Sequence, residues 1–328
     1  MAEIRTDPLG GAKVVIADDR ASRPGAFGNV TERPPIEPSK DPFSEGNESQ
    51  TPPELWALRP GGGPADSPGW LARAVPNLYP VLKPDSPSPA TDPDSDLFNA
   101  KPSIGAHEVV INSPRPVDSL AALNEAELDT AVGAWRERLA AHSESPCRHL
   151  FVNEGREAGA SLPHTHAQLV ALPFVPPAAA REREAFTAHA TRNGGRNLLA
   201  DILAAEVRRR ERIVAIDDDA VLLAPWAASS AYQLMIVPRD GRERFEDDGA
   251  TGAALLFSAL KALTARFGAP PPLNLWIRTK PSGADHWTWR INILPRLAQP
   301  AGIELGMGLG VNPVAPERAA AELRDLLS

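Results

Sequence analysis

The chain has 328 residues, of which 42% are hydrophobic, so it can bury one large core or two moderate ones. Its net charge of −8 argues against a surface that coats nucleic acid, although local arginines can still hold the phosphates of a nucleotide. The single cysteine excludes an intramolecular disulfide framework.

The N-terminal third is predicted to be rich in loops. The N-terminus contains Glu3 and Asp7 and lacks the apolar run that is typical of a signal peptide. No stretch of the chain approaches the roughly 18 consecutive apolar residues that a membrane-spanning helix needs. We therefore expect a cytoplasmic protein without a membrane partner. Residues 24–98 hold 16 of the 35 prolines, which favours long loops with short strands over a separately packed domain.

Regular elements are predicted from residue 107 onward. Strands at 107–112 and 148–153 flank a helix that begins near Asn124, with Glu127 as its capping partner. Its apolar stripe has helical spacing and consists of Leu128, Val132, Trp135 and Leu139. Further along we expect helices at 178–191, 197–212, 249–267 and 316–327, and strands at 213–216, 220–223, 232–237, 273–278 and 287–294. The order strand, strand, helix, strand, strand recurs in each half, which predicts an α+β protein with a large mostly antiparallel sheet and flanking helices.

The most informative segment is the kernel, residues 164–168, with the sequence His-Thr-His-Ala-Gln. If the kernel is a strand, His164, His166 and Gln168 share one face. Ser161 precedes it in a glycine-containing turn where backbone can approach a ligand closely. The same pattern is compatible with the solvated face of an edge strand or with half of a zinc site.

The kernel suits phosphorus chemistry. A neutral imidazole can attack an activated phosphorus atom if its other nitrogen donates its hydrogen to an acceptor. His166 is the best placed of the kernel side chains, because it lies between His164 and Gln168. The Gln168 amide can donate a hydrogen bond to a phosphoryl oxygen. Glutamine cannot protonate a leaving group or assist water, so its presence favours transfer to a second substrate over hydrolysis.

In the kernel and in several flanking motifs the chain resembles the galactose-1-phosphate uridylyltransferase family, within the histidine-triad superfamily. The matching segments run in order over nearly the whole chain and lie at residues 5–9, 14–24, 46–54, 75–80, 105–110, 293–297, 301–306 and 312–317. The resemblance implies two histidine-triad-like halves, 1–177 with the catalytic motif and 178–328, that together form the sheet.

The resemblance also implies roles for individual residues. His166 would become covalently nucleotidylated, supported by His164, while Gln168 and Ser161 contact the transferred group. The nucleotide would be bound by Asn153, Gly159, Ala160, Ser161, Asn77 and Leu78, and its phosphates by Arg20 and Arg23 from a partner subunit. We therefore expect a homodimer.

Metal ligands of the resembled family are missing here. Asp41 and Ser44 stand where the family often has two cysteines, and the histidine that follows a Ser-Pro pair is absent near Arg115. The family's iron-type site includes a His-Trp-His, and the segment here is residues 287–290, Trp-Thr-Trp-Arg, with His286 just before it. Glu182 or Glu184 stands where the family has a metal-binding glutamate, and both are expected to be solvated. We predict that neither metal is bound and that no cofactor is needed.

The leading prediction is therefore an enzyme of carbohydrate metabolism that moves a nucleoside monophosphate between a nucleoside diphosphate sugar and a sugar 1-phosphate. UDP-glucose–hexose-1-phosphate uridylyltransferase activity is the first candidate. The alternative with the same chemistry is a phosphorylase of ADP-glucose or of a dinucleoside polyphosphate, with phosphate as acceptor. The alternative of another class is a nucleotide-binding protein that has lost catalysis.

Overall fold

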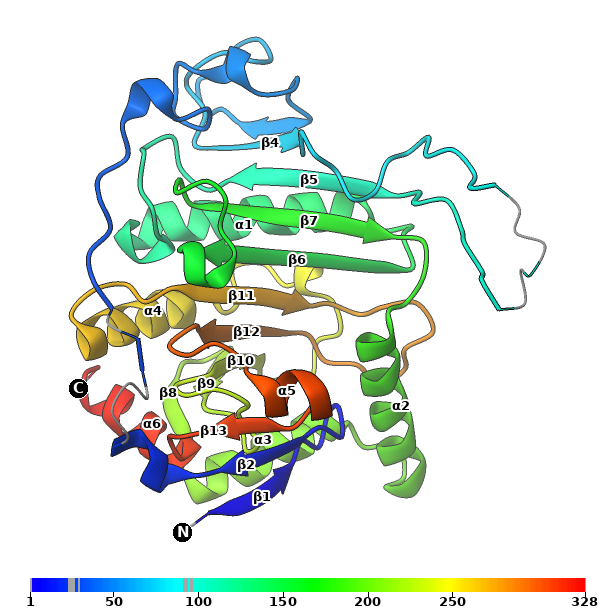
Figure 1. The fold of residues 1–328 in the computed structure, drawn as a ribbon, viewed down its shortest axis with the longest axis vertical. Helices are drawn as coiled ribbons and strands as arrows, with labels where there is room; N and C mark the ends of the chain where they lie inside the picture. Colours follow the sequence, from blue (N-terminus) through cyan, green and yellow to red (C-terminus); the bar gives the residue numbers. More distant parts are fainter. Residues whose placement is uncertain (1, 23–26, 29, 91–93, 95–96, 328) are drawn as a thin grey trace.

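The fold is organised by one long sheet. The computed structural model describes residues 2–22, 27–28, 30–90, 94 and 97–327. In spatial order the sheet contains β3 (Trp56–Leu58), β4 (Ala72–Pro76), β5 (Ala106–Ile111), β7 (His166–Leu172), β6 (Cys147–Glu154), β11 (Leu273–Arg278), β12 (Arg290–Pro295), β10 (Leu234–Pro238), β9 (Ala220–Leu223) and β8 (Ile213–Ile216) (Figure 1). All neighbouring strands are antiparallel, which confirms the predicted α+β class.

A small second sheet joins the two ends of the chain. It consists of β1 (Glu3–Thr6), β2 (Lys13–Ile16) and β13 (Gly310–Asn312), with β13 parallel to β2. This pairing could not be read from local sequence, because its partners lie about 300 residues apart. The predicted division at residue 177 stays a prediction; the long sheet runs without a break from β6 to β11 across it.

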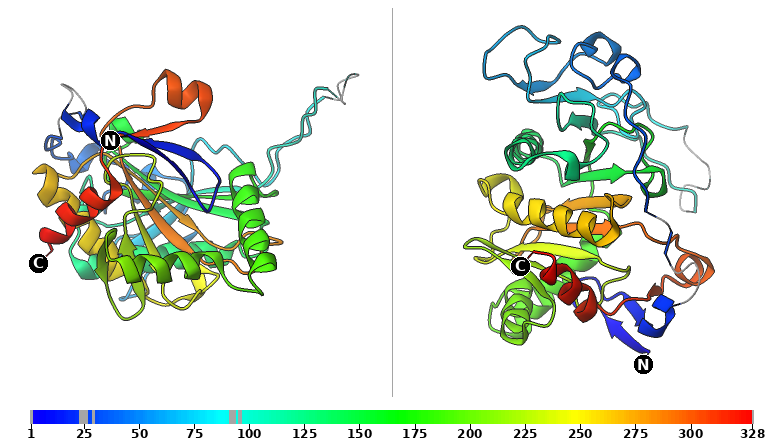
Figure 2. Two further views of the ribbon diagram at one scale, coloured as in Figure 1. Left: turned by 90° about the horizontal axis from the view of Figure 1, so that it is seen from below. Right: turned by 90° about the vertical axis from the view of Figure 1, so that its left-hand side faces the viewer.

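Helices cover the long sheet on both faces. The larger core packs α1 (Glu125–Ala141), α4 (Ala253–Phe267) and α6 (Pro316–Asp325) against one face, and the right-hand view of Figure 2 shows α1 and α4 on the same side. A second core packs α2 (Pro177–Arg192) and α3 (Leu198–Arg209) against the opposite face at β9 and β10. The middle strands of that opposite face carry polar and half-buried side chains, and we call it the site face. No helix among the described residues has both the length and the apolar character to cross a membrane.

Most predicted elements are present, and the differences have local causes. The capping box of α1 is confirmed, since Asn124 and Glu127 exchange hydrogen bonds. Helix α4 starts at residue 253 instead of 249 because Gly252 has a left-handed φ of 89°. Strand β12 starts at Arg290 instead of 287, because the backbone amide of Trp289 donates to Arg242 and not to the sheet. The short helix α5 (Gly302–Met307) was not predicted.

A buried polar network fixes β7 from the core side. Thr165 Oγ1 donates to Glu154 (2.9 Å) and accepts from Asn112 (3.1 Å), which in turn accepts from the Trp135 indole (2.8 Å). Ser119 Oγ also donates to Glu154, whose burial raises its pKa. All these side chains are almost fully buried, so each polar atom must find its partner inside the protein.

The substitution Thr165→Val tests this network. Valine keeps the shape but leaves the Asn112 amide without its acceptor, so we expect a loss of about 2 kcal/mol in the free energy of unfolding, measured by urea denaturation. Thr130→Val on the surface of α1, where the hydroxyl bonds only to its own helix, is the control and should change little. Equal losses for both variants would contradict the role of the network.

Candidate active site

Strand register brings the kernel side chains together with residues of three other strands. Gln168 on β7 is opposite Val109 on one side and Phe151 on the other, and Phe151 is opposite Trp276. Because alternate residues of a strand share a face, His166 and Gln168 both lie on the site face, while Ala167 and Leu169 enter the larger core. Strand β7 begins at His166, so His164 lies just ahead of the strand in the turn that leads into it.

His166 has the hydrogen bonding of a nucleophile. Its Nδ1 lies 2.7 Å from the backbone carbonyl of His164, which can only accept, so Nδ1 carries the proton and Nε2 keeps its lone pair. Burial lowers the pKa of His166, and the ring is therefore neutral near pH 7. The edge of the Phe43 ring packs against it with centroids 5.2 Å apart.

Gln168 is held through its carbonyl oxygen. Oε1 lies 3.0 Å from His107 Nε2 and 3.4 Å from Asn77 Nδ2. Asn77, which was expected near the base, is thus directly against Gln168. Its neighbour Leu78 is 64% exposed, and its proposed contact with the base is not tested by the structure.

Asn153 and the turn before the kernel form the other side of the site. Asn274 on β11 donates to Asn153 Oδ1 (2.8 Å) and to the carbonyl of Ala158, which ties β6, β11 and the turn together. Gly159 has a left-handed φ of 86° and approaches the free amide nitrogen of Asn153. The backbone amide of Ala160 closes the turn on Gly155.

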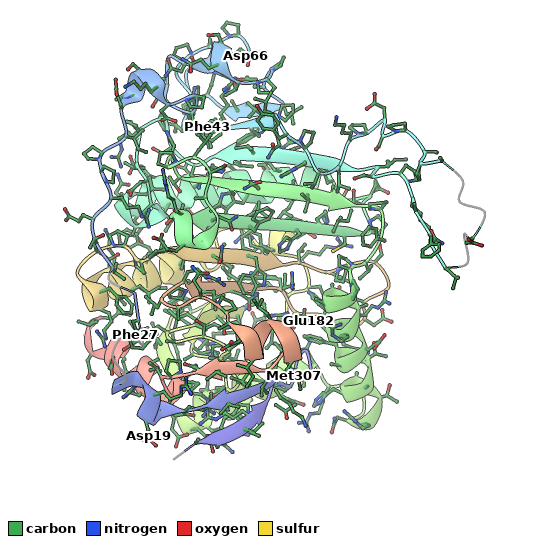
Figure 3. All side chains as sticks on the ribbon, in the orientation of Figure 1. Asp19, Phe27, Phe43, Asp66, Glu182 and Met307 are labelled. Atoms are coloured by element: carbon green, nitrogen blue, oxygen red, sulfur yellow. The ribbon has the colours of Figure 1, made fainter. Side chains whose placement is uncertain are left out.

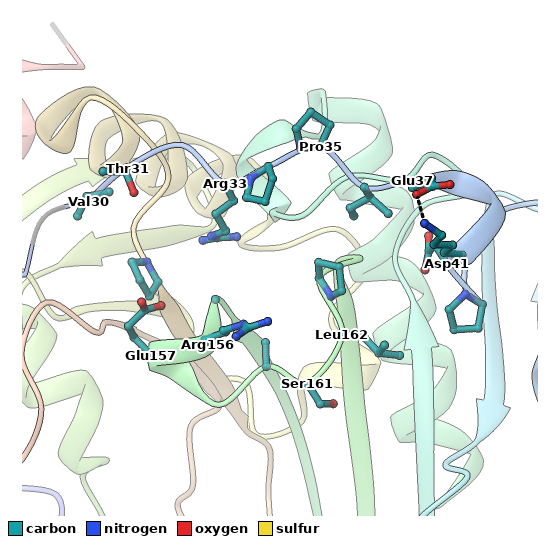
Figure 4. A pocket seen from close by; sticks show the side chains of 18 residues that line it. Val30, Thr31, Arg33, Pro35, Glu37, Asp41, Arg156, Glu157, Ser161 and Leu162 are labelled. Atoms are coloured by element: carbon teal, nitrogen blue, oxygen red, sulfur yellow. Dashed lines mark ion pairs between the residues drawn. The ribbon is translucent and has the colours of Figure 1, made fainter.

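A cavity of about 450 Å³ adjoins this turn (Figure 4). One wall is a proline-rich strap, residues 30–42, and the other is the turn 155–163. Exposed Ser161 lies on its rim, and Figure 4 shows Arg156 extending into the space between the two walls. The cavity offers room for part of a ligand beside the Gly159–Ser161 turn.

His164 lies beside His166, with the Phe43 ring against both, and is completely buried in a cluster with Asp41 and Ser44. Its Nδ1 is 2.5 Å from Asp41 Oδ2, which also accepts from Ser44 Oγ, and its Nε2 is 2.9 Å from the carbonyl of Ser113. Both ring nitrogens of His164 thus face acceptors of the protein. This donor set does not fit zinc, since both nitrogens of His164 and the carboxylate of Asp41 are already engaged by protein partners. Arg115 is paired with Glu127 elsewhere.

The expectation that Glu182 is solvated was wrong. Its side chain is 13% exposed and lies 2.7 Å from Arg290 and 3.5 Å from Arg278 (Figure 3). Burial works to raise the pKa of Glu182, but the two guanidinium groups outweigh burial and lower it. Two cations beside one carboxylate do not fit an iron site. Glu184 is exposed, as expected.

Arg20 is not near the kernel of the same chain. It is exposed on a 3-10 helix, Asp18–Ser22, that follows β2 of the small sheet, whereas β7 lies within the long sheet (Figures 1 and 2). Arg23 is outside the described residues. Two residues that do reach the site, His107 and Asn274, were missed as site residues. Their strands were predicted, but no local pattern indicates which side chains they meet across the sheet.

The Asp41–His164 pair gives a prediction for stability. Burial works to raise the pKa of Asp41, but hydrogen bonds from His164 and Ser44 outweigh it and hold the pKa below its ordinary value of 3.8. A depressed pKa stabilises the fold above that value, and the contribution is lost as the pH falls through the folded-state pKa. Asp41→Asn should therefore lower the free energy of unfolding by about 3 kcal/mol at pH 7. The difference from the unmodified protein should shrink below pH 3.8 in chemical denaturation.

The matched control is Asp85→Asn, because Asp85 is exposed and has no ion pair in the described structure. Its stability should follow that of the unmodified protein at every pH. A deficit of Asp41→Asn that stays constant down to strongly acidic pH would show that the charge of Asp41 is not what stabilises the cluster.

Comparisons with known proteins identify the family of the chain. The family described as galactose-1-phosphate uridyl transferase, N-terminal domain, matches residues 2–176. ADP-glucose phosphorylase of Arabidopsis thaliana is 29% identical over 99% of this chain and 93% of its own. A galactose-1-phosphate uridylyltransferase of Cryptococcus neoformans is 27% identical over 98% and 90%. The crystal structure of the Arabidopsis ADP-glucose phosphorylase with bound ADP-glucose superposes with a TM-score of 0.80, at 26% identity over 99% of both chains. The chain therefore belongs to the galactose-1-phosphate uridylyltransferase family of nucleotidyltransferases.

Proposed function

We propose that the protein transfers a nucleoside monophosphate from a nucleoside diphosphate sugar to a second substrate through a covalent intermediate on His166. Nε2 of His166 attacks the α-phosphorus and forms a P–N bond. The bond from phosphorus to the bridging oxygen breaks, and the electron pair leaves with the sugar 1-phosphate. The proton stays on Nδ1, and its hydrogen bond to the carbonyl of His164 stabilises the positive charge that develops on the ring.

The observation that carries this proposal is the fixed tautomer of His166. A buried neutral imidazole with Nδ1 engaged has one free nucleophilic atom, and that atom belongs to the site face beside Gln168. The free amide nitrogens of Gln168 and Asn153 can donate to the phosphoryl oxygens as charge builds on them. In the second step the acceptor, a sugar 1-phosphate or inorganic phosphate, takes the nucleotide and frees Nε2.

Two nucleotide donors fit this chemistry. UDP-glucose, with a hexose 1-phosphate as acceptor, is the first candidate from the sequence. ADP-glucose, with phosphate as acceptor, is the second, and the specific observation in its favour is the similarity to the Arabidopsis ADP-glucose phosphorylase along nearly the whole chain. The same covalent step serves both reactions.

Intact-protein mass spectrometry tests the proposal. After mixing with UDP-glucose or ADP-glucose, the protein should gain the mass of one nucleoside monophosphate on His166 with one of the two donors. His166→Ala should form no adduct, because the attacking atom is gone. The donor that gives the faster adduct identifies the base.

The control is His286→Asn, since His286 is exposed and its positive φ of 59° is one that asparagine tolerates. This variant should form the adduct at the normal rate. An adduct that persists in His166→Ala, or no adduct with either donor, would refute the covalent mechanism. Release of free nucleotide without acceptor would indicate a hydrolase instead.

We further propose that the reaction needs neither zinc nor iron. This is supported by the chemistry of the two donor sets, in which His164 and Glu182 are already engaged by Asp41 and Arg290. Elemental analysis of the purified active protein is the direct check, and stoichiometric zinc or iron would contradict it.

A second copy of the chain is proposed to complete the site with Arg20 and Arg23. This is supported by the exposure of Arg20, whose 3-10 helix follows β2 of the small sheet and is separate from the strands that carry the kernel. The variant His166→Ala and the double variant Arg20→Ala/Arg23→Ala should each form little adduct when expressed alone. When the two chains are co-expressed, part of the activity should return, because one of the two sites in a mixed dimer combines an intact His166 with intact arginines.

The control is co-expression of each variant with itself. The arginines do not act across subunits if the co-expressed sample is no more active than the summed activities of the two variants. The same follows if sedimentation shows a monomer at the assay concentration.

A further inference from the structure

Gln168 can serve the reaction only if its amide nitrogen, not its oxygen, faces the phosphate. The two ends of a glutamine amide are similar in shape, and a rotation of 180° exchanges donor for acceptor. An oxygen facing the phosphoryl group would repel the charge that the transition state builds up. The structure must therefore contain a group that decides which end of Gln168 points away from the site.

His107 on β5 is one such group. Its Nδ1 lies 3.2 Å from the backbone amide of Val81, which can only donate, so Nδ1 must accept and the ring proton must be on Nε2. Nε2 is 3.0 Å from Gln168 Oε1 and donates to it. Burial lowers the pKa of His107, so the ring stays neutral and keeps this tautomer near pH 7.

Asn77 acts on the same oxygen by the same logic. The backbone amide of Tyr79 donates to Asn77 Oδ1 (2.8 Å), which forces the Asn77 amide nitrogen to the other side. That nitrogen lies 3.4 Å from Gln168 Oε1. It is also 3.2 Å from His107 Nε2, which carries the ring proton and so cannot accept from it. Two donors, each oriented by a backbone amide of segment 77–81, thus converge on one acceptor.

A reversed Gln168 would place its NH₂ group against two other donors. Each would lose its acceptor in a half-buried position, which makes the reversed orientation costly. Within the described part of the chain, the amide nitrogen of Gln168 has no partner, so it is the end available to a ligand.

Resting on the nucleotidyl transfer proposed above, we propose that His107 and Asn77 are positioning residues for Gln168. They do not touch the reacting atoms. They hold the carbonyl oxygen of Gln168 away from the phosphoryl group, so that its N–H groups are preorganised for the transition state.

A double-mutant cycle on the rate of adduct formation, followed by quenched-flow mass spectrometry, tests this. Gln168→Ala should slow the step about a hundredfold. His107→Leu should slow it about tenfold, the usual effect of removing a group behind a functional side chain. The double variant should be no slower than Gln168→Ala, because His107 acts only through Gln168. His107→Gln, whose Nε2 can still donate, should recover most of the rate.

His149→Leu is the matched control. His149 and His107 flank Val170 from opposite strands on the same face. The ring of His149 stacks on Phe151 and its Nδ1 lies 3.3 Å from Arg278 Nη1, with no hydrogen bond to Gln168 among the described residues. Any slowing by His149→Leu should therefore multiply with that of Gln168→Ala. If the effects of His107→Leu and Gln168→Ala also multiply, the positioning role is refuted.

A second measurement does not depend on activity. Nitrogen-15 NMR of labelled histidine in the otherwise unmodified protein and in His166→Ala should show His107 neutral with the proton on Nε2 at pH 7. The opposite tautomer, or a charged ring, would overturn the proposal even if adducts form. Absence of adducts in the unmodified protein would instead count against the nucleotidyl transfer, and the NMR result would then still decide the hydrogen-bond arrangement.

Discussion

The site depends on the antiparallel pairing of β7 with β5 and β6. A strand alternates its side chains between two faces, so one register decides at once what is buried and what is presented. Ala167 and Leu169 enter the larger core, and His166 and Gln168 are left on the site face. A shift of one residue would exchange the two sets, and burying the kernel side chains without partners would be costly. Behind the strand, the buried hydrogen bonds of Thr165 to Glu154 and Asn112 hold the register in place.

Three polar groups of the site are bound to the protein at one end, and no partner for the other end is found among the described residues. His166 donates through Nδ1 to its own turn, Asn153 accepts from Asn274, and Gln168 accepts from His107 and Asn77. Such groups need little reorganisation when charge develops on a ligand, because their alternative orientations are blocked beforehand. The same arrangement lets a neutral histidine and two amides meet the charge of a ligand without reorienting.

Buried side-chain pairs join distant segments at two positions where the sequence suggested lost metal ligands. A divalent cation neutralises nearby carboxylates or thiolates and joins distant segments of chain. Here His164 pairs with Asp41 and joins the loop before β3 to the kernel, while Arg278 and Arg290 pair with Glu182 and join α2 to the sheet. The segments are therefore connected by side-chain contacts of the protein itself.

The spacing of apolar residues in the helices and strands, and the chemistry of the kernel, could be predicted from the sequence. Alternation in 164–168 and helical spacing in α1 depend on neighbours a few residues apart, and such patterns are local. The capping box at Asn124 could be predicted because its two residues are only three positions apart. Tertiary structure alone decided which partners lie across the sheet. His107 and Asn274 come from strands 59 residues before and 108 residues after His166, and nothing local distinguishes them from ordinary strand residues. The same holds for the arginines at Glu182 and for the pairing of β2 with β13, since contacts between distant segments are set by packing of the whole chain.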